Sequence, residues 1–312
     1  MRTDQTLKGV LLAFASFAAY SWSDASVKMI EGALTPYEMG FFGAVFMLAG
    51  FPYLMKPGDS WLDVVRSTNR PLWVLRFFSA AVGTIGSVAA FTYLSMAEAF
   101  ALIFLLPSFV TIMSVLFLKE TVGIRRWSAV IIGFVGVLVI LRPGFRELSI
   151  GHVGAVFAGI SGAISIIVYR AVGPSEKHIS LYGAGVLGVL VILGILMIPD
   201  FHWPTLPQWV MLAGYGLLAA LATVWLMYAA NYAPAAVIGP TQYSQMLWAI
   251  LFGYLVFGDT VDLPMLIGIV LIIGSGLLTL ARERARDVRL PASVATDQQA
   301  AVVTVPDNKS DT

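Results

Sequence analysis

The amino-acid sequence predicts an all-α membrane protein: ten transmembrane helices in two inverted five-helix repeats, with both termini in the cytoplasm. Three observations predict this class, namely the division of an apolar chain into blocks, the one-sided placement of basic residues, and an internal repeat. Of the 312 residues, 58% are hydrophobic and only 12% are charged, and the mean hydropathy is +0.84. Because a soluble domain carries about 25% charged residues, this chain has too few to coat a water-facing surface.

The hydrophobic residues fall into blocks of about 18–24 residues, the length that crosses a hydrocarbon core of about 30 Å. A β-barrel would show short alternating strands instead. Prolines lie at or near many block ends, and the polar segment 286–312 lacks periodicity and is predicted to be a disordered tail. The ten blocks are 8–29, 36–55, 72–94, 98–118, 124–141, 151–171, 179–198, 207–230, 234–257 and 263–281.

Basic residues are distributed unequally between the two sides of these blocks. Fifteen Lys and Arg residues fall on the side of the N-terminus, and only Lys28, Arg142 and Arg146 fall on the other, with remote Lys309 left out. Because translocation of Lys and Arg is disfavoured, the richer side is predicted to be the cytoplasm. An error of one block would scramble this separation, so the charge pattern also supports ten spans.

The two halves of the chain resemble one another. A shift of 145 residues aligns the first blocks of each half, and a shift of 139 aligns the later ones. Five spans per unit is an odd number, so the second unit must enter the membrane inverted, and such repeats typically form a substrate site near the midplane between them. We expect repeat units at 1–145 and 146–285, aligned through Gly9/Gly154, Ser16/Ser161, Tyr37/Tyr182, Thr84/Thr223 and Tyr93/Tyr232.

Three stretches resemble a known family. They are WSDASVK (22–28), YLSMAEAFALIFLLPSFVTIMSVLFLKETVGIRRWSAVIIGFVGVLVILRPG (93–144) and NYAPAAVIGPTQYSQMLWAILFGYLVFGDTV (231–261). They are similar to the drug/metabolite transporter superfamily, EamA type, and within it to bacterial YddG-type amino-acid exporters. The resemblance implies a multi-pass secondary transporter of the bacterial inner membrane. A proline common to both repeats of the family is present as Pro107, but Met246 stands at the equivalent position, which predicts a kink in one repeat only.

A polar cluster interrupts the ninth block and supplies most candidate substrate-binding residues. Gln245 lies about 16 Å from the inner end of this block, near the midplane. Amides facing lipid would lack hydrogen-bond partners, so they face either a watery cavity or neighbouring helices, where they would act as glue. Spacing of i, i+3, i+4 and i+7 places four of these residues on one face. The candidates are Thr241, Gln242, Tyr243, Ser244, Gln245 and Trp248.

Four further candidates lie elsewhere. Asp24 is either a functional carboxylate or half of an interfacial ion pair with Lys28, and Trp22 is either a belt aromatic or a cavity wall. Pro107 lies near the midplane of the fourth block, where a kink can open backbone carbonyls to a cavity. Tyr232 stands near the cytoplasmic end of the eighth block.

The sequence favours a secondary transporter over the alternatives. An enzyme acting on lipid would need His, Asp or Ser side chains that come together at the membrane interface, and the sequence shows no such group. A channel would need a ring of matching polar residues, but the two repeats differ at the equivalent positions. There is no Walker motif, so neither ATP nor an ATPase partner is implied, and no cofactor, metal or nucleic acid is expected. The expected partners are small molecules, amino acids above all, and the lipid bilayer; the oligomeric state is open, and a monomer is compatible. Amino-acid export, aromatic ones included, is predicted, with import of S-adenosylmethionine or a related metabolite, or drug export, as the alternatives.

The predicted topology can be tested by thiol labelling, because the chain contains no Cys. Single cysteines at Ser175 and Thr205 should differ, since the basic asymmetry places the first inside and the second outside. Impermeant thiol reagent added to intact cells should label position 205 and leave position 175 unlabelled. Labelling of position 175 alone would overturn both the orientation and the number of spans.

Overall fold

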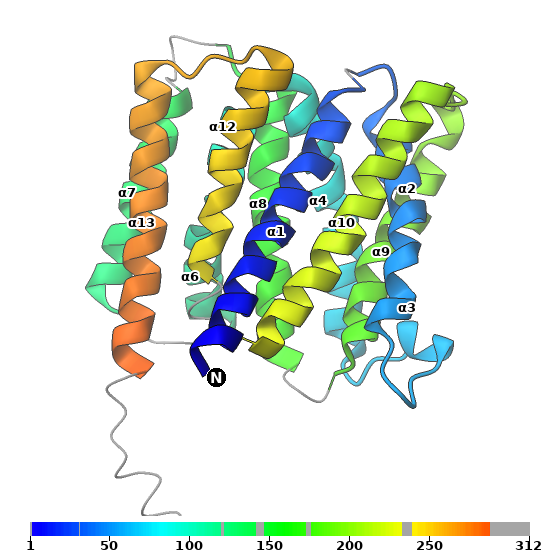
Figure 1. The fold of residues 1–312 in the computed structure, drawn as a ribbon, viewed down its shortest axis with the longest axis horizontal. Coiled ribbons are helices and arrows are strands. Elements are labelled where there is room, and N and C mark those ends of the chain that lie inside the picture. The colour runs from blue at the N-terminus through cyan, green and yellow to red at the C-terminus, as the bar shows by residue number, and fades with distance from the viewer. Residues whose placement is uncertain are drawn as a thin grey trace, which may run out of the picture.

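The structure, a computed structural model, describes residues 2–30, 32–119, 122–141, 147–172, 176–232 and 239–287. Within these residues the protein is all-helical, without strands, and every predicted block contains helix (Figure 1). The α-helices are α1 (Arg2–Lys28), α2 (Pro36–Met47), α3 (Phe51–Leu54), α4 (Arg70–Tyr93), α5 (Met96–Ile103), α6 (Leu106–Phe117), α7 (Ile124–Leu141), α8 (Ile150–Val172), α9 (His178–Leu196), α10 (Leu206–Tyr232), α12 (Ser244–Phe257) and α13 (Leu263–Asp287). Short 3-10 turns are η1 (Leu48–Gly50), η2 (Trp61–Val64), η4 (Ile198–Asp200) and η5 (Gly239–Tyr243).

Length and composition identify helices that can cross a membrane. Six described helical segments are long and apolar enough, and two shorter apolar helices accompany them. Large apolar side chains are exposed on the outer faces of the helices, among them Leu138, Val210 and Leu247. In water such a surface would be unfavourable, whereas hydrocarbon accepts it. The protein is therefore a multi-pass membrane protein.

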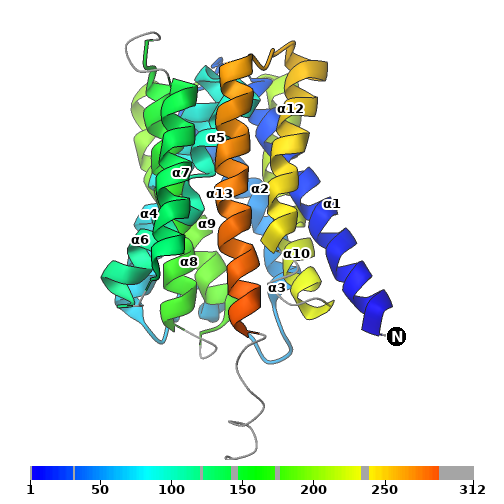
Figure 2. The same ribbon diagram turned by 90° about the vertical axis from the view of Figure 1, so that its left-hand side faces the viewer.

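Antiparallel helix pairs drawn from the two halves of the chain build the bundle. Helix α1 packs on α10 and α4 packs on α8, while α2 contacts α9, α5 contacts α12, and α7 contacts α13. Figure 2 looks onto the side of the bundle formed by α7 and α13, which lie side by side there. If each helix is exchanged for its counterpart in the other half, every one of these contacts maps onto itself or onto another of the same set.

Three helix contacts, two of them named above, depend on paired glycines. A Cβ on Gly86 would lie 2.4 Å from the carbonyl oxygen of Gly154, where α4 crosses α8. The same holds for α10 on α2, because a Cβ on Gly216 would lie 2.2 Å from Gly43 O. On α13, a Cβ on Gly268 would lie 2.7 Å from the carbonyl oxygen of Gly136 on α7. Small residues let helix backbones approach closely in lipid, where no hydrophobic effect drives helices together.

The fourth and ninth predicted blocks are both broken, at equivalent places. Helix α5 gives way to α6 at Leu105 (φ −64°, ψ −11°), and η5 gives way to α12 at Tyr243 (φ −64°, ψ −14°). Both blocks thus change helix geometry at equivalent places, and a kink in one repeat only stays a prediction. Pro107, in the first turn of α6, accounts for the change in the fourth block, because proline cannot continue the hydrogen bonding of a preceding helix. Thr241 and Gln242 thus sit on a 3-10 turn, so the predicted continuous helical face from Thr241 to Trp248 is also interrupted.

The described part of the chain ends on helix α13. That helix continues to Asp287, so the predicted tail (286–312) begins inside a helix, and residues 288–312 lie outside the described residues. Of the two labelling positions, Thr205 is exposed and Ser175 lies outside the described residues. The basic tail residue Arg289 is likewise not described.

Substitution of Gly86 by Ala should destabilise the bundle. The added methyl group meets a backbone carbonyl that cannot move aside, and overpacking costs about 1–3 kcal/mol, against a helix-propensity gain of about 1 kcal/mol. Gly274→Ala is the matched control, because a Cβ there meets nothing within 4 Å. Melting temperatures in detergent should fall for Gly86→Ala and stay level or rise for Gly274→Ala; an equal response of both variants would contradict the proposed close contact.

Candidate functional site

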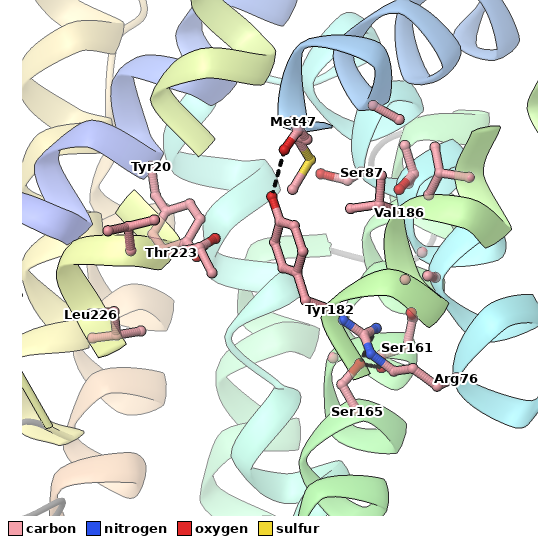
Figure 3. A pocket seen from close by; sticks show the side chains of 18 of the residues that line it. Tyr20, Met47, Arg76, Ser87, Ser161, Ser165, Tyr182, Val186, Thr223 and Leu226 are labelled. Atoms are coloured by element: carbon pink, nitrogen blue, oxygen red, sulfur yellow. Dashed lines mark hydrogen bonds between the residues drawn. The ribbon is translucent and has the colours of Figure 1, made fainter. Parts of the chain in front are cut away.

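A cavity of about 990 Å³ runs through the middle of the bundle. Its walls come from both halves of the chain, with contributions from α1, α2, α4, α5, α8, α9, α10 and α12. Figure 3 shows Tyr20 and Thr223 on one side, Arg76, Ser161 and Ser165 on the other, and Tyr182 between them. Its volume lies at the upper end of the range of small-molecule sites, about 300–1,000 Å³. The cavity can therefore hold a metabolite of considerable size.

The cavity opens at the end of the bundle that carries the N-terminus, here the N-terminal end. Tyr53, Lys56, Pro57 and His178 line it there and are exposed. Near this mouth, Lys177 Nζ lies 3.0 Å from Asp59 Oδ1 and 2.7 Å from Asp63 Oδ2. These ion pairs fasten the 55–69 connection to the start of α9.

Local hydrogen bonds keep both carboxylates ionised at the mouth. The backbone N–H of Lys56, followed by the Lys177 ammonium, holds the pKa of Asp59 below its ordinary value. Lys177, followed by the backbone N–H of Ser60, lowers the pKa of Asp63 in the same way. Reciprocally, the two carboxylates raise the pKa of Lys177. The bridge is therefore charged throughout the physiological pH range, although its exposure limits its strength.

The opposite end of the bundle, here the far end, is closed by a partly buried ion pair. Lys28 Nζ lies 2.9 Å from Asp259 Oδ2 and donates to the carbonyl oxygen of Leu94 at 3.0 Å. The same carboxylate oxygen accepts the backbone N–H of Met96 at 3.0 Å. One carboxylate thus ties together the end of α1, the α4–α5 turn and the α12–α13 turn. None of these residues lines the cavity.

Two histidine–carboxylate contacts reinforce the far end. His152 Nε2 lies 3.2 Å from Glu98 Oε1, which links the start of α8 to the first turn of α5. Glu38 is fully buried, completes a capping box with Thr35 at the start of α2, and accepts the backbone N–H of His202. The hydroxyl of Ser95 caps Glu98 N–H at 3.2 Å. The cavity is therefore sealed on this side by polar contacts between different spans.

Hydroxyl groups line the middle of the cavity. The Tyr20 and Thr223 oxygens lie 2.8 Å apart and join α1 to α10. Tyr182 donates to the carbonyl oxygen of Met47 at 2.8 Å, close to where α2 passes into η1 (Figure 3). Ser161 donates to Ser79 O at 2.6 Å, between α8 and α4. Each of these bonds crosses between the two halves of the chain, so the cavity walls are held in place from both sides.

Arg76 on α4 is a cavity residue that sequence reasoning missed. It was counted only among the basic residues of the N-terminal side, yet its guanidinium Nη1 donates to Ser165 Oγ at 2.7 Å within the cavity wall. Its Cζ lies 5.9 Å from the centroid of the Tyr169 ring. The available signal was its position inside the apolar block 72–94 rather than before it, because charges within a span usually mark function.

Three of the predicted substrate-binding residues line the cavity: Gln242, Gln245 and Asp24. The two glutamine side chains make no hydrogen bond to any other residue that the structure describes, which is expected of groups facing open space and not of groups joining helices. Asp24 lines the cavity as well, whereas Lys28 bonds Asp259. The alternative of an Asp24–Lys28 ion pair is therefore wrong, because Lys28 reaches across the far end instead of along its own helix.

The remaining members of the polar cluster pack beside the cavity and do not line it. Thr241 and Ser244 are buried. Tyr243 stacks on Phe104 with ring centroids 5.7 Å apart, and Trp248 stacks on Phe252 at 5.8 Å. Neither Tyr243 nor Trp248 is among the residues that line the cavity.

The last three candidates lie away from the cavity. Trp22 is 44% exposed and meets the edge of Phe252, as a belt aromatic would. Pro107 borders a separate small pocket beside Ser108 and Thr111. Tyr232 lies under Lys8 Nζ, which is 4.5 Å from the ring centroid.

Comparison with known proteins decides the family. A family model described as the EamA-like transporter family matches residues 7–142 and again residues 149–281. The chain belongs to the EamA-like transporter family. The members named among its relatives are transporters and not enzymes, which agrees with a cavity built from hydroxyl, amide and charged groups. The family match also confirms the resemblance to the drug/metabolite transporter superfamily.

Named relatives of this EamA-like protein carry different substrates. An S-adenosylmethionine uptake transporter of Rickettsia bellii is 27% identical over 282 residues, covering 86% of this chain and 92% of the relative. A riboflavin transporter of Vibrio cholerae is 27% identical over 252 residues, covering 79% and 82%. A solved crystal structure matches with a TM-score of 0.60 at 17% identity, over 93% of this chain and 100% of that chain, and this likeness shows the fold alone.

Loss of the far-end ion pair should open the cavity on that side. Asp259→Asn removes the charge that holds Lys28 and weakens the acceptor for Met96 N–H; a hydrogen bond to a charged group contributes about 1.5–3 kcal/mol. In a Phe100→Cys background, which places a thiol on the cavity wall, impermeant reagent applied from the far side should react several-fold faster.

Asp200→Asn, which changes an exposed aspartate near the same end, is the control and should leave the labelling rate unchanged. If Asp259→Asn and Asp200→Asn give the same labelling rate for the thiol introduced at position 100, the ion pair does not hold the far end closed.

Proposed function

We propose that this protein is a secondary transporter that moves small organic metabolites across the bacterial inner membrane by alternating access. One observation carries the proposal: a large cavity is open at one end of the bundle and sealed at the other by contacts between spans. A channel would be open at both ends, and an enzyme would need reactive groups that converge. A cavity that faces one side at a time is what a carrier requires.

The architecture we propose is a pair of inverted five-helix repeats, 1–145 and 146–285, with both termini in the cytoplasm. Two separate matches to one family model support the duplication. The antiparallel pairing of α1 with α10 and of α4 with α8 supports the inversion, since each contact has its counterpart when the repeats are exchanged. With the basic residues inside, the N-terminal end faces the cytoplasm and the cavity is open inward.

Amino-acid export, including aromatic residues, is the substrate and direction that we propose first. Tyr20, Tyr169, Tyr182 and Tyr215 supply aromatic wall, and Gln242 and Gln245 supply neutral hydrogen-bonding groups that can both donate and accept. Uptake of S-adenosylmethionine is the second candidate, favoured by the Rickettsia bellii relative, and that molecule carries an amino-acid group of its own.

Transport by purified protein tests the proposal directly. Proteoliposomes should exchange labelled L-tryptophan or S-adenosylmethionine against unlabelled solute in a saturable manner, without ATP. Empty liposomes set the background. Flux that rises linearly with concentration and never saturates would identify a pore and exclude a carrier.

Gln245→Leu should weaken substrate binding without unfolding the protein. The substitution keeps the volume but removes an amide that faces the cavity, and losing one or two hydrogen bonds to a charged group costs about 1.5–3 kcal/mol each, roughly tenfold to a hundredfold in affinity. Gln5→Leu, the same change at an exposed position of α1, is the control.

The half-saturation concentration for exchange should rise in Gln245→Leu, while its melting temperature stays close to that of the parent. A lowered melting temperature with normal transport per folded molecule would instead mean that Gln245 joins helices.

A further inference from the structure

We propose that Arg76 and Asp24 are the two charged poles of the cavity and select a zwitterionic substrate: Arg76 binds its carboxylate and Asp24 its cationic group. The inference rests on the proposed transport function and names the chemical class that the cavity accepts. It follows from the placement of two opposite charges that share one cavity. Neither side chain forms an ion pair with a described residue.

Arg76 offers a guanidinium whose hydrogen-bonding capacity is largely unused. Its Nη1 donates to Ser165 Oγ at 2.7 Å, and its buried Nε has no hydrogen-bond partner among the described residues. A guanidinium has five N–H donors arranged as a planar fork that fits a carboxylate with two parallel bonds. Among the residues that the structure describes, no carboxylate occupies that fork.

Helix α9 has a glycine, Gly185, where it passes the guanidinium of Arg76. A Cβ on Gly185 of α9 would lie 3.1 Å from Arg76 Nη2, closer than nine in ten real contacts of that kind. A glycine at this point leaves room for the flat guanidinium beside the α9 backbone. The Tyr169 ring lies nearby as well, with its centroid 5.9 Å from Cζ. The guanidinium is thus held in position, which favours a fixed binding group over a side chain that reaches out to water.

Asp24 is the opposite pole. It lines the cavity from α1 and makes no hydrogen bond or ion pair to another described residue. The cation on its own helix, Lys28, is committed to Asp259 at the far end. A carboxylate within a membrane span that is not paired structurally usually belongs to a substrate or ion pathway.

The two charges do not neutralise each other. No described contact within 4.0 Å joins the two side chains, so in the empty cavity each lacks a partner of opposite charge. A neutral substrate would leave both uncompensated, and an anion without a cationic group would leave Asp24 uncompensated. A solute that carries both signs satisfies both groups at once, which is how opposite-charge complementarity creates specificity.

The test is binding to the full-length protein in detergent, measured by calorimetry with two matched sets of ligands. The first set is L-tryptophan, tryptamine, which lacks the carboxylate, and indole-3-propionate, which lacks the ammonium group. The second set is S-adenosylmethionine and 5′-methylthioadenosine, which lacks the carboxylate, the ammonium group and the sulfonium charge. In each set the zwitterion should bind roughly tenfold to a hundredfold more tightly than its analogues.

Variants then assign each pole. In Arg76→Gln, L-tryptophan affinity should fall to that of tryptamine, because the carboxylate has lost its partner, while tryptamine affinity itself stays level. In Asp24→Asn, L-tryptophan affinity should fall to that of indole-3-propionate. Arg76→Lys keeps the charge but not the fork and should recover part of the discrimination. Arg70→Gln, which changes an exposed arginine at the start of the same helix, is the control and should change nothing.

A purely structural Arg76 would give a different pattern. Ser165→Ala and Arg76→Gln would then lower the melting temperature alike, and discrimination between L-tryptophan and tryptamine would survive in the folded fraction, which would overturn the proposal. Equal wild-type affinities for zwitterions and their analogues would also overturn the proposal, and so would tight binding of inorganic phosphate at Arg76. Either result would stand against the two charged poles even if proteoliposomes transported a neutral solute such as riboflavin, which would support the transport function alone. Zwitterion-selective binding without any transport would instead support the binding roles of Arg76 and Asp24 and contradict the proposed transport function.

Discussion

Hydrocarbon offers no hydrogen bonds, and this constraint decides where every polar group of the spans can lie. A hydroxyl, amide or charge is stable there when it finds a partner inside the bundle or faces a space that holds water or substrate. Ser16, Ser23 and Ser161 meet the constraint by donating to backbone carbonyls of neighbouring helices. Arg76, Asp24, Gln242 and Gln245 meet it by facing the cavity. The polar interior and the apolar exterior are two results of the same requirement.

Close helix contacts and the cavity are also linked. Where glycines face each other, as at Gly86 and Gly154, the backbones meet and no space remains. The cavity lies elsewhere between the two halves of the chain, with Tyr20 and Tyr182 among the side chains that line it. The far end then needs a separate closure, and Asp259 provides it by bonding Lys28 and Met96 N–H together. Packing therefore sets the position of the cavity, and electrostatics sets which end is closed.

The sequence predicted the architecture well because membrane thickness and hydrogen-bond satisfaction leave few choices. All ten blocks contain helix. The sequence left Gln245 open between a cavity and a helix contact, and Asp24 open between a functional carboxylate and an ion pair with Lys28; both side chains line the cavity, and their contact with a substrate stays a prediction. The structure does not show the predicted face shared by Thr241 and Trp248. That prediction assumed a continuous α-helix, whereas the 3-10 turn η5 changes the direction in which the side chain of Thr241 points relative to those of α12. Arg76 escaped notice because a basic residue near a span end is usually an interfacial anchor. Its surroundings depend on Gly185 and Ser165, which lie far away in sequence and meet it only in the fold.

The matching breaks at Leu105 and Tyr243 have a consequence for the surrounding lipid. Each break divides its span, so that α5 and α12, which contact each other at the far end, are separated from α6 and η5 near the N-terminal end. A bend at these two residues would shift one end of the bundle while the other end kept its place. Both divided spans also expose apolar side chains, Leu116 and Phe117 on α6 and Tyr254 and Leu255 on α12. A bend there would therefore alter the surface that the surrounding bilayer has to cover, and the elastic properties of the lipid would contribute to the free energy of that movement.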